Sequence, residues 1–285
     1  MRFKKLKNKF FEFFGVTKNY QCGSFLITLP LGHALPDYQL ANQKYDKFLP
    51  NLVRFLNNSD VVVDVGANVG DTLAGMVSAN VNLSYVCIEP DPLFFGFLEK
   101  NTARIQSAAH ALDARLVNAF IGKNISDVHL VGSRGTKHAV MNSEGGIKAV
   151  LLRDVVPGNL LERIRLIKSD VDGFDYDVIE ASNDIISSLG PLVFFECQFD
   201  CAPQKSGYVK AIKWLASDGY CDWILLDNFG GVIIRTSDLC IIEQLMEYIW
   251  QQNIGKATRT IYYMDILAAR SHDSKLLDAV LSGYA

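Results

Sequence analysis

The sequence lacks the features of a membrane-spanning protein and of a nucleic-acid-binding protein. None of its 285 residues belongs to an uninterrupted apolar run that approaches the roughly 18 residues of a membrane span. Lysine and arginine number 28 against 31 aspartates and glutamates, so the formal net charge of −3 offers no broad basic surface for nucleic acid. No apolar segment of a signal peptide follows the basic N-terminal residues. We therefore expect a globular, cytoplasmic protein.

Cysteine and histidine are few and scattered, which argues against a zinc site. Only Cys197 and Cys201 lie close together in the sequence, and no second cysteine pair or histidine cluster accompanies them. Free buried cysteines pack as small apolar residues, so we expect reduced thiols inside the protein.

The most informative segment is a valine-rich strand that contains an acid and leads into a glycine turn. Residues 61–65 form an apolar run around Asp64, as is typical of a strand buried on both faces. Gly66 and Gly70 follow, and without a Cβ they let the backbone turn tightly and approach a ligand. Their G-x-x-x-G spacing differs from the G-x-G-x-x-G of dinucleotide-binding proteins. The segment therefore favours S-adenosylmethionine over NAD.

A second acid follows about one β-α-β unit later. The apolar segment 84–88 ends at Glu89, and a carboxylate at this place in a nucleotide-binding sheet accepts the ribose hydroxyls. Pro90 and Pro92 end the strand and stiffen the loop. An ordinary α/β sheet with a glycine turn and a strand-ending glutamate is the alternative interpretation.

Strands and helices alternate along the chain, which predicts right-handed crossovers and a mostly parallel sheet. We expect an α/β, Rossmann-like domain over 58–285, with a seven-stranded sheet that finishes with an antiparallel edge strand. The expected strands are 61–65, 84–89, 115–120, 165–170, 191–196, 221–227 and 260–267. The expected helices are 70–79, 92–106, 174–188, 206–218 and 238–253, with a short final helix. The region 122–150 is predicted to hold short antiparallel strands, among them 148–152.

Residues 1–57 are expected to form an N-terminal extension, with a hairpin over 20–38 and a helix over 40–57 that Pro50 kinks. Its first 14 residues combine five basic side chains with apolar ones at helical spacing. Such a helix could lie on an anionic membrane surface at the inner face of the membrane. The alternative is that its apolar stripe packs on the domain or on a second subunit, which would make a homodimer.

Acidic residues end four of the five predicted parallel strands. They are Asp64, Glu89, Asp170 and Glu196, and Asn118 with Ala119 ends the fifth. Because like charges crowded at one edge repel, a cationic ligand would stabilise them, or a divalent metal ion such as Mg²⁺ held by Asp170 and Glu196.

The segment Lys168 to Asp175 is the second dense motif. Its glycine spacing and the lack of a closing glutamate exclude an EF-hand calcium loop. Asp172 is expected to cap the following helix, and Asp175 to lie in its first turn. Those roles leave Lys168 and Asp170 unexplained, and both are expected at the sheet edge.

Several stretches resemble the FkbM-type methyltransferases, a group of Rossmann-like enzymes that depend on S-adenosylmethionine. In the family's order they are 64–72, 88–92, 117–119, 167–175 and 191–196. The family's usual motif K-x-D-x-E-G-x-E has Asp172 and Asp175 in its glutamate positions here. The segment 32–38 also resembles one that precedes the core in some members.

The resemblance implies the class I methyltransferase fold, S-adenosylmethionine as cofactor, and methyl transfer to a hydroxyl of a sugar or glycan precursor. The precursor would be a polysaccharide, a lipopolysaccharide or a nucleotide sugar. The implied cofactor-binding residues are Asp64, Gly66, Asn68, Gly70, Asp71, Thr72, Glu89, Pro90, Asn118, Ala119 and Asp170. A sugar hydroxyl must be aligned and lose its proton. The candidates for this work are Asp170, Lys168, Glu196 and His33, and those for stacking on a sugar ring are Tyr38, Tyr208 and Trp223.

Two other function classes stay open at the level of sequence. A nicotinamide-dependent oxidoreductase is disfavoured by the G-x-x-x-G spacing and by the lack of a Tyr-x-x-x-Lys pair near the fourth strand. A non-catalytic glycan-binding or assembly subunit is disfavoured by the intact set of Asp64, Gly66 and Glu89, which a retired site has no reason to keep.

Overall fold

The computed structural model describes residues 16–123, 128–133, 136–141, 148–256 and 258–284. The predicted N-terminal basic helix falls outside these described residues. Within them, no helix is both long enough and apolar enough to cross a membrane.

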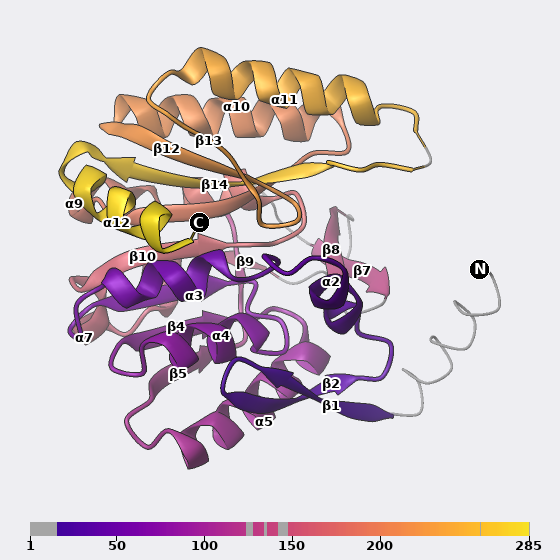
Figure 1. Ribbon diagram of the computed structural model, residues 1–285, viewed down its shortest axis with the longest axis vertical. Helices are drawn as coiled ribbons and strands as arrows, with labels where there is room; N and C mark the ends of the chain where they lie inside the picture. The colour runs from indigo at the N-terminus through magenta and orange to yellow at the C-terminus, as the bar shows by residue number, and fades with distance from the viewer. Residues whose placement is uncertain (1–15, 124–127, 134–135, 142–147, 257, 285) are drawn as a thin grey trace.

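A central sheet of eight strands confirms the predicted α/β architecture (Figure 1). Its order is β13 (Val232–Thr236), β12 (Tyr220–Asp227), β14 (Tyr263–Arg270), β11 (Leu192–Gln198), β10 (Ile164–Ser169), β3 (Val61–Val65), β4 (Ser84–Ile88) and β5 (Asp113–Val117). The five strands from β11 to β5 are mutually parallel, and β14 lies antiparallel between β11 and β12.

The expected count of seven strands was one too low, because β13 pairs antiparallel with β12 at the edge of the sheet. The Asp227 side chain makes this hairpin by accepting hydrogen bonds from the backbone N–H groups of Phe229 and Gly231, at 2.9 and 2.8 Å. An aspartate that bonds the backbone two residues later is a turn former, so the chain reverses directly into another strand.

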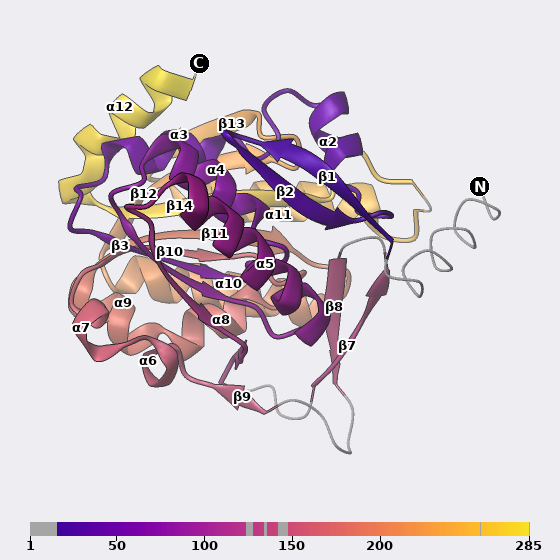
Figure 2. The ribbon, with the colours of Figure 1, turned by 90° about the horizontal axis from the view of Figure 1, so that it is seen from below.

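Helices cover both faces of the sheet, and residues of β3 alternate between the two cores. Val62 packs with one core, whereas Val61, Val63 and Val65 pack with the other. The first core involves α3 (Phe48–Leu52), α4 (Asp71–Ala79), α5 (Pro92–Ala108) and α12 (Ser274–Tyr284). The second involves α6 (Leu152–Val155), α7 (Gly158–Leu161), α8 (Asp175–Ala181), α9 (Asn183–Leu189), α10 (Ala202–Ser217) and α11 (Leu239–Asn253). Figure 2 shows the sheet between these layers.

The N-terminal hairpin is present and is tied to the glycine turn. It consists of β1 (Thr17–Cys22) and β2 (Phe25–Pro30). The buried Asn101 amide on α5 donates to the carbonyl oxygens of Thr28 and Val69, at 2.9 and 2.8 Å, and accepts from the Thr28 N–H. One side chain therefore links the hairpin, α5 and the loop that follows β3.

Three local predictions were wrong. In place of the helix expected over 40–57, the chain forms α2 (Leu35–Ala41), α3 and the 3₁₀ turn η1 (Val53–Phe55). Pro50 does not kink a longer helix, because it lies in the first turn of α3, where proline is tolerated. The helix expected over 174–188 is broken at Ser182 into α8 and α9. The segment 148–152 pairs only through β9 (Ala149–Val150), which is parallel to β6 (Phe120–Ile121). The expected antiparallel strands of this region are β7 (Val128–Ser133) and β8 (Thr136–Met141).

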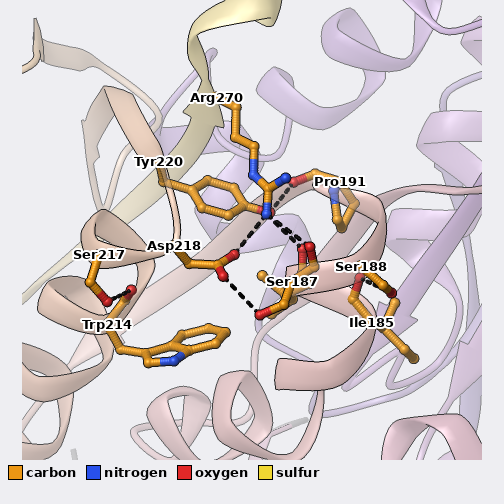
Figure 3. A network of polar contacts seen from close by, with 10 residues as sticks. Ile185, Ser187, Ser188, Pro191, Trp214, Ser217, Asp218, Tyr220 and Arg270 are labelled. Atoms are coloured by element: carbon orange, nitrogen blue, oxygen red, sulfur yellow. Dashed lines mark hydrogen bonds and ion pairs between the residues drawn. The ribbon is translucent and has the colours of Figure 1, made fainter.

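Polar contacts gather at the edge of the sheet where the parallel strands begin. Figure 3 shows the Arg270 guanidinium donating to Asp218 at 2.7 Å and to the Ser187 carbonyl at 3.2 Å, above the Tyr220 ring. The Tyr220 hydroxyl donates to the Pro191 carbonyl at 2.7 Å. The start of β11, the start of β12 and the end of β14 are joined in this way.

Candidate active site

A cavity of about 560 Å³ opens at the other edge, where the parallel strands end. This is the edge at which open α/β sheets bind their ligands. The structure brings eight of the predicted site residues to its wall: His33, Gly66, Asn68, Asp71, Thr72, Lys168, Asp170 and Glu196. It places six others outside the lining: Asp64, Gly70, Glu89, Pro90, Asn118 and Ala119.

Asp64 and Lys168 form a buried ion pair beneath the glycine turn. Lys168 Nζ lies 2.8 Å from Asp64 Oδ1, 3.7 Å from Asp170 Oδ2, and donates to the Gly66 carbonyl at 3.0 Å. Burial by itself would lower the pKa of Lys168, but Asp64 and Asp170 outweigh it and raise that pKa above its usual value. Lys168 therefore remains a cation that fixes the turn, and Asp64 acts on the turn through it.

The glycine turn has left-handed backbone at Gly66 and Asn68, with φ of 79° and 47°. A Cβ added at Gly66 would lie 2.0 Å from the Asp170 carbonyl oxygen. Glycine is needed here because the ends of β3 and β10 approach too closely for any side chain. The same contact fixes Asp170 beside the turn.

Glu89 lies behind the turn. Its two carboxylate oxygens accept hydrogen bonds from the backbone N–H groups of Asn68 and Asp91, at 2.9 and 2.8 Å. Burial raises the pKa of Glu89 to about 7. Asn118 donates to the carbonyls of Glu89 and Pro90, at 2.8 and 3.1 Å. Each carboxylate oxygen keeps a second lone pair, so Glu89 still has acceptors for ribose hydroxyls.

His33 is buried at the wall of the cavity. Its Nδ1 accepts a hydrogen bond from the Leu35 N–H at 3.3 Å, and burial lowers its pKa. In neutral imidazole the other nitrogen then carries the hydrogen. His33 is thus arranged as a hydrogen-bond donor rather than as the proton acceptor expected from the sequence.

Asp172 and Asp175 have different roles from those expected. Helix α8 begins after Phe174, whose side chain makes no capping hydrogen bond, so Asp172 does not cap it. Asp175 lies in the first turn as expected, but it is fully buried. It accepts hydrogen bonds from Ser169 Oγ at 2.6 Å and from the Tyr208 hydroxyl at 3.0 Å. Asp175 therefore holds the loop after β10 in place, and Tyr208 is committed to this contact.

Sequence analysis missed several residues of the cavity wall. Asp265 on β14 pairs in register with Glu196 on β11, so both side chains lie on one face of the sheet. Tyr38 faces the cavity as expected, and its ring stacks on that of Tyr45 with centroids 5.2 Å apart. Trp223 is buried in the core and does not line the cavity. Other missed residues of the wall include Asp46, Arg259, Tyr262 and Tyr263.

The charge of the cavity wall suits a cation. Seven acidic side chains line it against two lysines and one arginine. Burial raises the pKa values of four of them, Asp46, Asp172, Glu196 and Asp265, so a bound cation would favour their ionised form. The sulfonium and amino groups of S-adenosylmethionine fit such a wall, whereas the pyrophosphate of a dinucleotide does not. Among the residues that the structure describes, no group of three His, Cys, Asp or Glu is arranged to hold a metal ion.

Comparison with known proteins agrees with this geometry. The family model for the methyltransferase FkbM domain matches residues 64–220, more than half of the chain. The chain belongs to the FkbM methyltransferase family. Its members are S-adenosylmethionine-dependent methyltransferases, and the matched residues of this FkbM methyltransferase run from β3 to the start of β12. No curated protein matches the sequence.

Solved structures with a similar arrangement are methyltransferases of low sequence identity. The FkbM methyltransferase of Methylobacillus flagellatus has 14% identity and a TM-score of 0.41, over 75% of this chain and 44% of that one. This chain thus spans less than half of that protein. The precorrin-6y C5,15-methyltransferase of Geobacter metallireducens has 14% identity and a TM-score of 0.42, over 78% and 86% of the two chains. M. jannaschii TYW2, solved with AdoMet, has 10% identity and a TM-score of 0.42, over 89% and 86%.

Proposed function

We propose that this FkbM methyltransferase binds S-adenosylmethionine at the glycine turn and methylates a hydroxyl of a sugar or glycan precursor. The cofactor would be held by residues 66–72, with Glu89 and Asn118 on the ribose side. When bound, it supplies an electrophilic methyl group on a sulfonium sulfur. The remaining chemistry concerns how the chain positions the acceptor and removes its proton.

The position of Asp170 carries the proposal. Its carboxylate is half exposed to the cavity, directly after β10 and against the glycine turn. Asp170 thus lies between the cofactor end of the cavity and the wall formed by β11 and β14. A hydroxyl in line with the methyl group would lie within reach of this carboxylate, which would accept its proton as the new carbon–oxygen bond forms and the methyl–sulfur bond breaks, with S-adenosylhomocysteine as the leaving group.

Two further residues support Asp170 without taking the proton. Lys168 Nζ lies 3.7 Å from its carboxylate and stays charged, so it attracts the carboxylate and helps to fix its position. His33 lines the same cavity near the glycine-turn residues Asn68 and Asp71, and its second ring nitrogen is a hydrogen-bond donor. The tyrosine rings of Tyr38, Tyr45 and Tyr262 provide flat apolar surface on which a sugar ring can stack.

Calorimetric titration of the purified protein with S-adenosylmethionine tests the cofactor, with NADH as control. We expect saturable binding of the methyl donor with Kd of about 1–100 µM, and no heat from NADH. Radiolabelled methyl donor with a panel of sugars then tests the reaction, because a methyl ether retains the label. Binding of NADH alone would support an oxidoreductase, and cofactor binding without transfer to any acceptor would support a glycan-binding subunit.

A further inference from the structure

Glu196 and Asp265 form a pair of neighbouring carboxylates that the proposed methyl transfer does not use. They are register partners on the antiparallel strands β11 and β14. Side chains so paired have Cβ atoms about 4.5–5.5 Å apart, and like charges directly opposite one another are destabilising. The arrangement therefore costs stability and calls for a ligand that removes the repulsion.

Glu196 points to such a ligand. The residue is only 6% exposed, and it lies at the cavity wall. Its Oε2 atom is buried and accepts no hydrogen bond from any residue in the described part of the chain. Burial and the neighbouring carboxylates raise the pKa values of both Glu196 and Asp265 well above their usual range. A buried acceptor facing a cavity is costly unless a donor from the ligand meets it.

The cations of the cavity wall are already engaged. Lys168 pairs with Asp64, and Arg259 forms an ion pair with Asp200. Lys44 lies over the Tyr284 ring with its Nζ 5.2 Å from the centroid. The excess of carboxylates at this wall would repel a nucleoside diphosphate or a phosphorylated lipid.

The pair lies away from the glycine turn that is proposed to hold the cofactor. The order β3, β10, β11, β14 places Glu196 two strands and Asp265 three strands from the glycine turn. At about 4.8 Å per strand, they lie about 10 and 14 Å from it. Glu196 lies only one strand from Asp170, so it is a sulfonium held at the turn, and not one beside Asp170, that would leave Glu196 and Asp265 for a second cation.

An ammonium group suits the pair better than a metal ion. Metal ions need several oxygen ligands at about 2.0–2.6 Å, and the described residues hold no such group of three. An ammonium needs one or two charge-assisted hydrogen bonds of about 2.7–2.9 Å. The Tyr262 and Tyr263 rings at the same end of the cavity add faces that attract a cation.

We propose that Glu196 and Asp265 form an acceptor subsite for a protonated amine, so that the substrate is an amine-bearing sugar rather than a phosphorylated one. The proposal rests on the proposed methyltransferase function and narrows its substrate class. The ammonium would donate to Glu196 Oε2 and lie between the two carboxylates, and the hydroxyl to be methylated would then lie toward Asp170.

Two disaccharides that differ only in N-acetylation, which removes the charge of each amine, test the subsite. Glucosamine disaccharide carries two amines, and its N,N′-diacetyl form carries none. Each is titrated into the protein saturated with S-adenosylhomocysteine, in buffer without divalent metal. We expect the amine form to bind at least about tenfold more tightly, a difference of about 1.4 kcal/mol. Equal binding of the two forms, or no binding of the amine form, would overturn the proposal.

Three variants test whether the preference for the amine form arises from Glu196 and Asp265. Glu196→Gln and Asp265→Asn should each remove about tenfold or more of the preference for the amine form, because each removes one charge from the subsite. Asp154→Asn removes one exposed charge on α6, in the opposite layer, and should change nothing. Titration of each variant with S-adenosylmethionine separates the two proposals. If the parent protein does not bind S-adenosylmethionine, the methyltransferase function is refuted. If it binds S-adenosylmethionine but does not prefer the amine form of the disaccharide, the subsite alone is refuted.

Discussion

Charged residues are arranged in opposite ways at the two ends of the parallel strands, which form two opposite edges of the central sheet. Where the parallel strands begin, Arg165, Arg235 and Arg270 each pair with an aspartate: Asp273, Asp222 and Asp218. Where the strands end, carboxylates from β10, β11 and β14 face one cavity, and the nearest lysine is held by Asp64. The first edge balances its charges within the fold, and the second does not.

This difference separates the residues that stabilise the protein from those that we propose serve a ligand. Paired side chains that close the ends of strands contribute to stability directly. Crowded buried carboxylates with raised pKa values cost stability, and such groups cluster at functional sites. Lys168 is the residue common to both uses, because it stabilises the turn and contacts Asp170.

Replacing Lys168 should have the largest effect. Lys168→Met leaves the Asp64 carboxyl buried without its partner, so we expect the free energy of unfolding to fall by about 3–5 kcal/mol. Urea denaturation followed by circular dichroism measures this. The double variant with Asp64→Asn should recover part of the loss, since the unpaired carboxyl is removed. A loss below about 1 kcal/mol would mean that the pair is not buried as described.

Asp170→Asn should separate chemistry from stability at the carboxyl edge. Because Asp170 is half exposed, we expect the free energy of unfolding to change by no more than about 0.5 kcal/mol. The rate of methyl transfer should fall by about 10²–10⁴-fold, as the proton acceptor is lost. Single-turnover assays with radiolabelled methyl donor measure the rate, and calorimetry should give an unchanged cofactor affinity. Transfer at the parent rate would remove Asp170 from the mechanism.

The sequence was sufficient to predict several of the residues that gather where the parallel strands end, because local signals mark them. The valine run before Gly66, the acid at Glu89 and the motif around Asp170 each combine strand pattern with turn chemistry. The α/β class and the family followed from them, and both are confirmed. Parallel strands bring their carboxyl ends together whatever the details of the connecting segments.

What the sequence could not predict depends on register and on distant contacts. Asp265 joins the site because β14 runs antiparallel and pairs it with Glu196, which no local pattern records. Glu89 was expected to accept the ribose hydroxyls, and no pattern in the sequence indicated that it also accepts hydrogen bonds from two backbone N–H groups. The only signal for Asp265 was that it is an acid on the predicted strand 260–267. The order of the elements along the chain does not say which strand pairs with that one.

Arg270→Met tests the edge of the sheet where the parallel strands begin. Its guanidinium donates to the Asp218 carboxylate and to two carbonyls, so we expect a loss of about 2 kcal/mol in the free energy of unfolding. Cofactor affinity and the rate of methyl transfer at a temperature where the variant is folded should match the parent protein. Asp218→Asn is the matched control, because it removes the same ion pair from the other side. A change in transfer rate equal to that of Asp170→Asn would show that the two edges are not separate.

The smallest expected effect is the pH dependence that Glu89 gives to cofactor binding. Its pKa is raised from 4.5 to about 7, so the folded state favours the protonated form. The contribution that protonation of Glu89 makes to the free energy of unfolding is fully present below pH 4.5 and is lost as the pH rises through about 7. Cofactor affinity should have the opposite trend, since protonation removes an acceptor for the ribose hydroxyls. We expect the Kd for S-adenosylmethionine to rise about tenfold from pH 8 to pH 6.

Calorimetric titrations across this range, repeated with Glu89→Gln, assign the trend to this residue. The variant cannot ionise, so it should bind the cofactor more weakly at pH 8, with a Kd that stays nearly constant down to pH 6. Asp154→Asn should follow the parent curve, because that exposed carboxylate lies on α6, in the layer opposite the cofactor turn. A parent curve as flat as that of Glu89→Gln would place the ribose elsewhere, and would leave Glu89 with the single role of anchoring the backbone of the glycine turn.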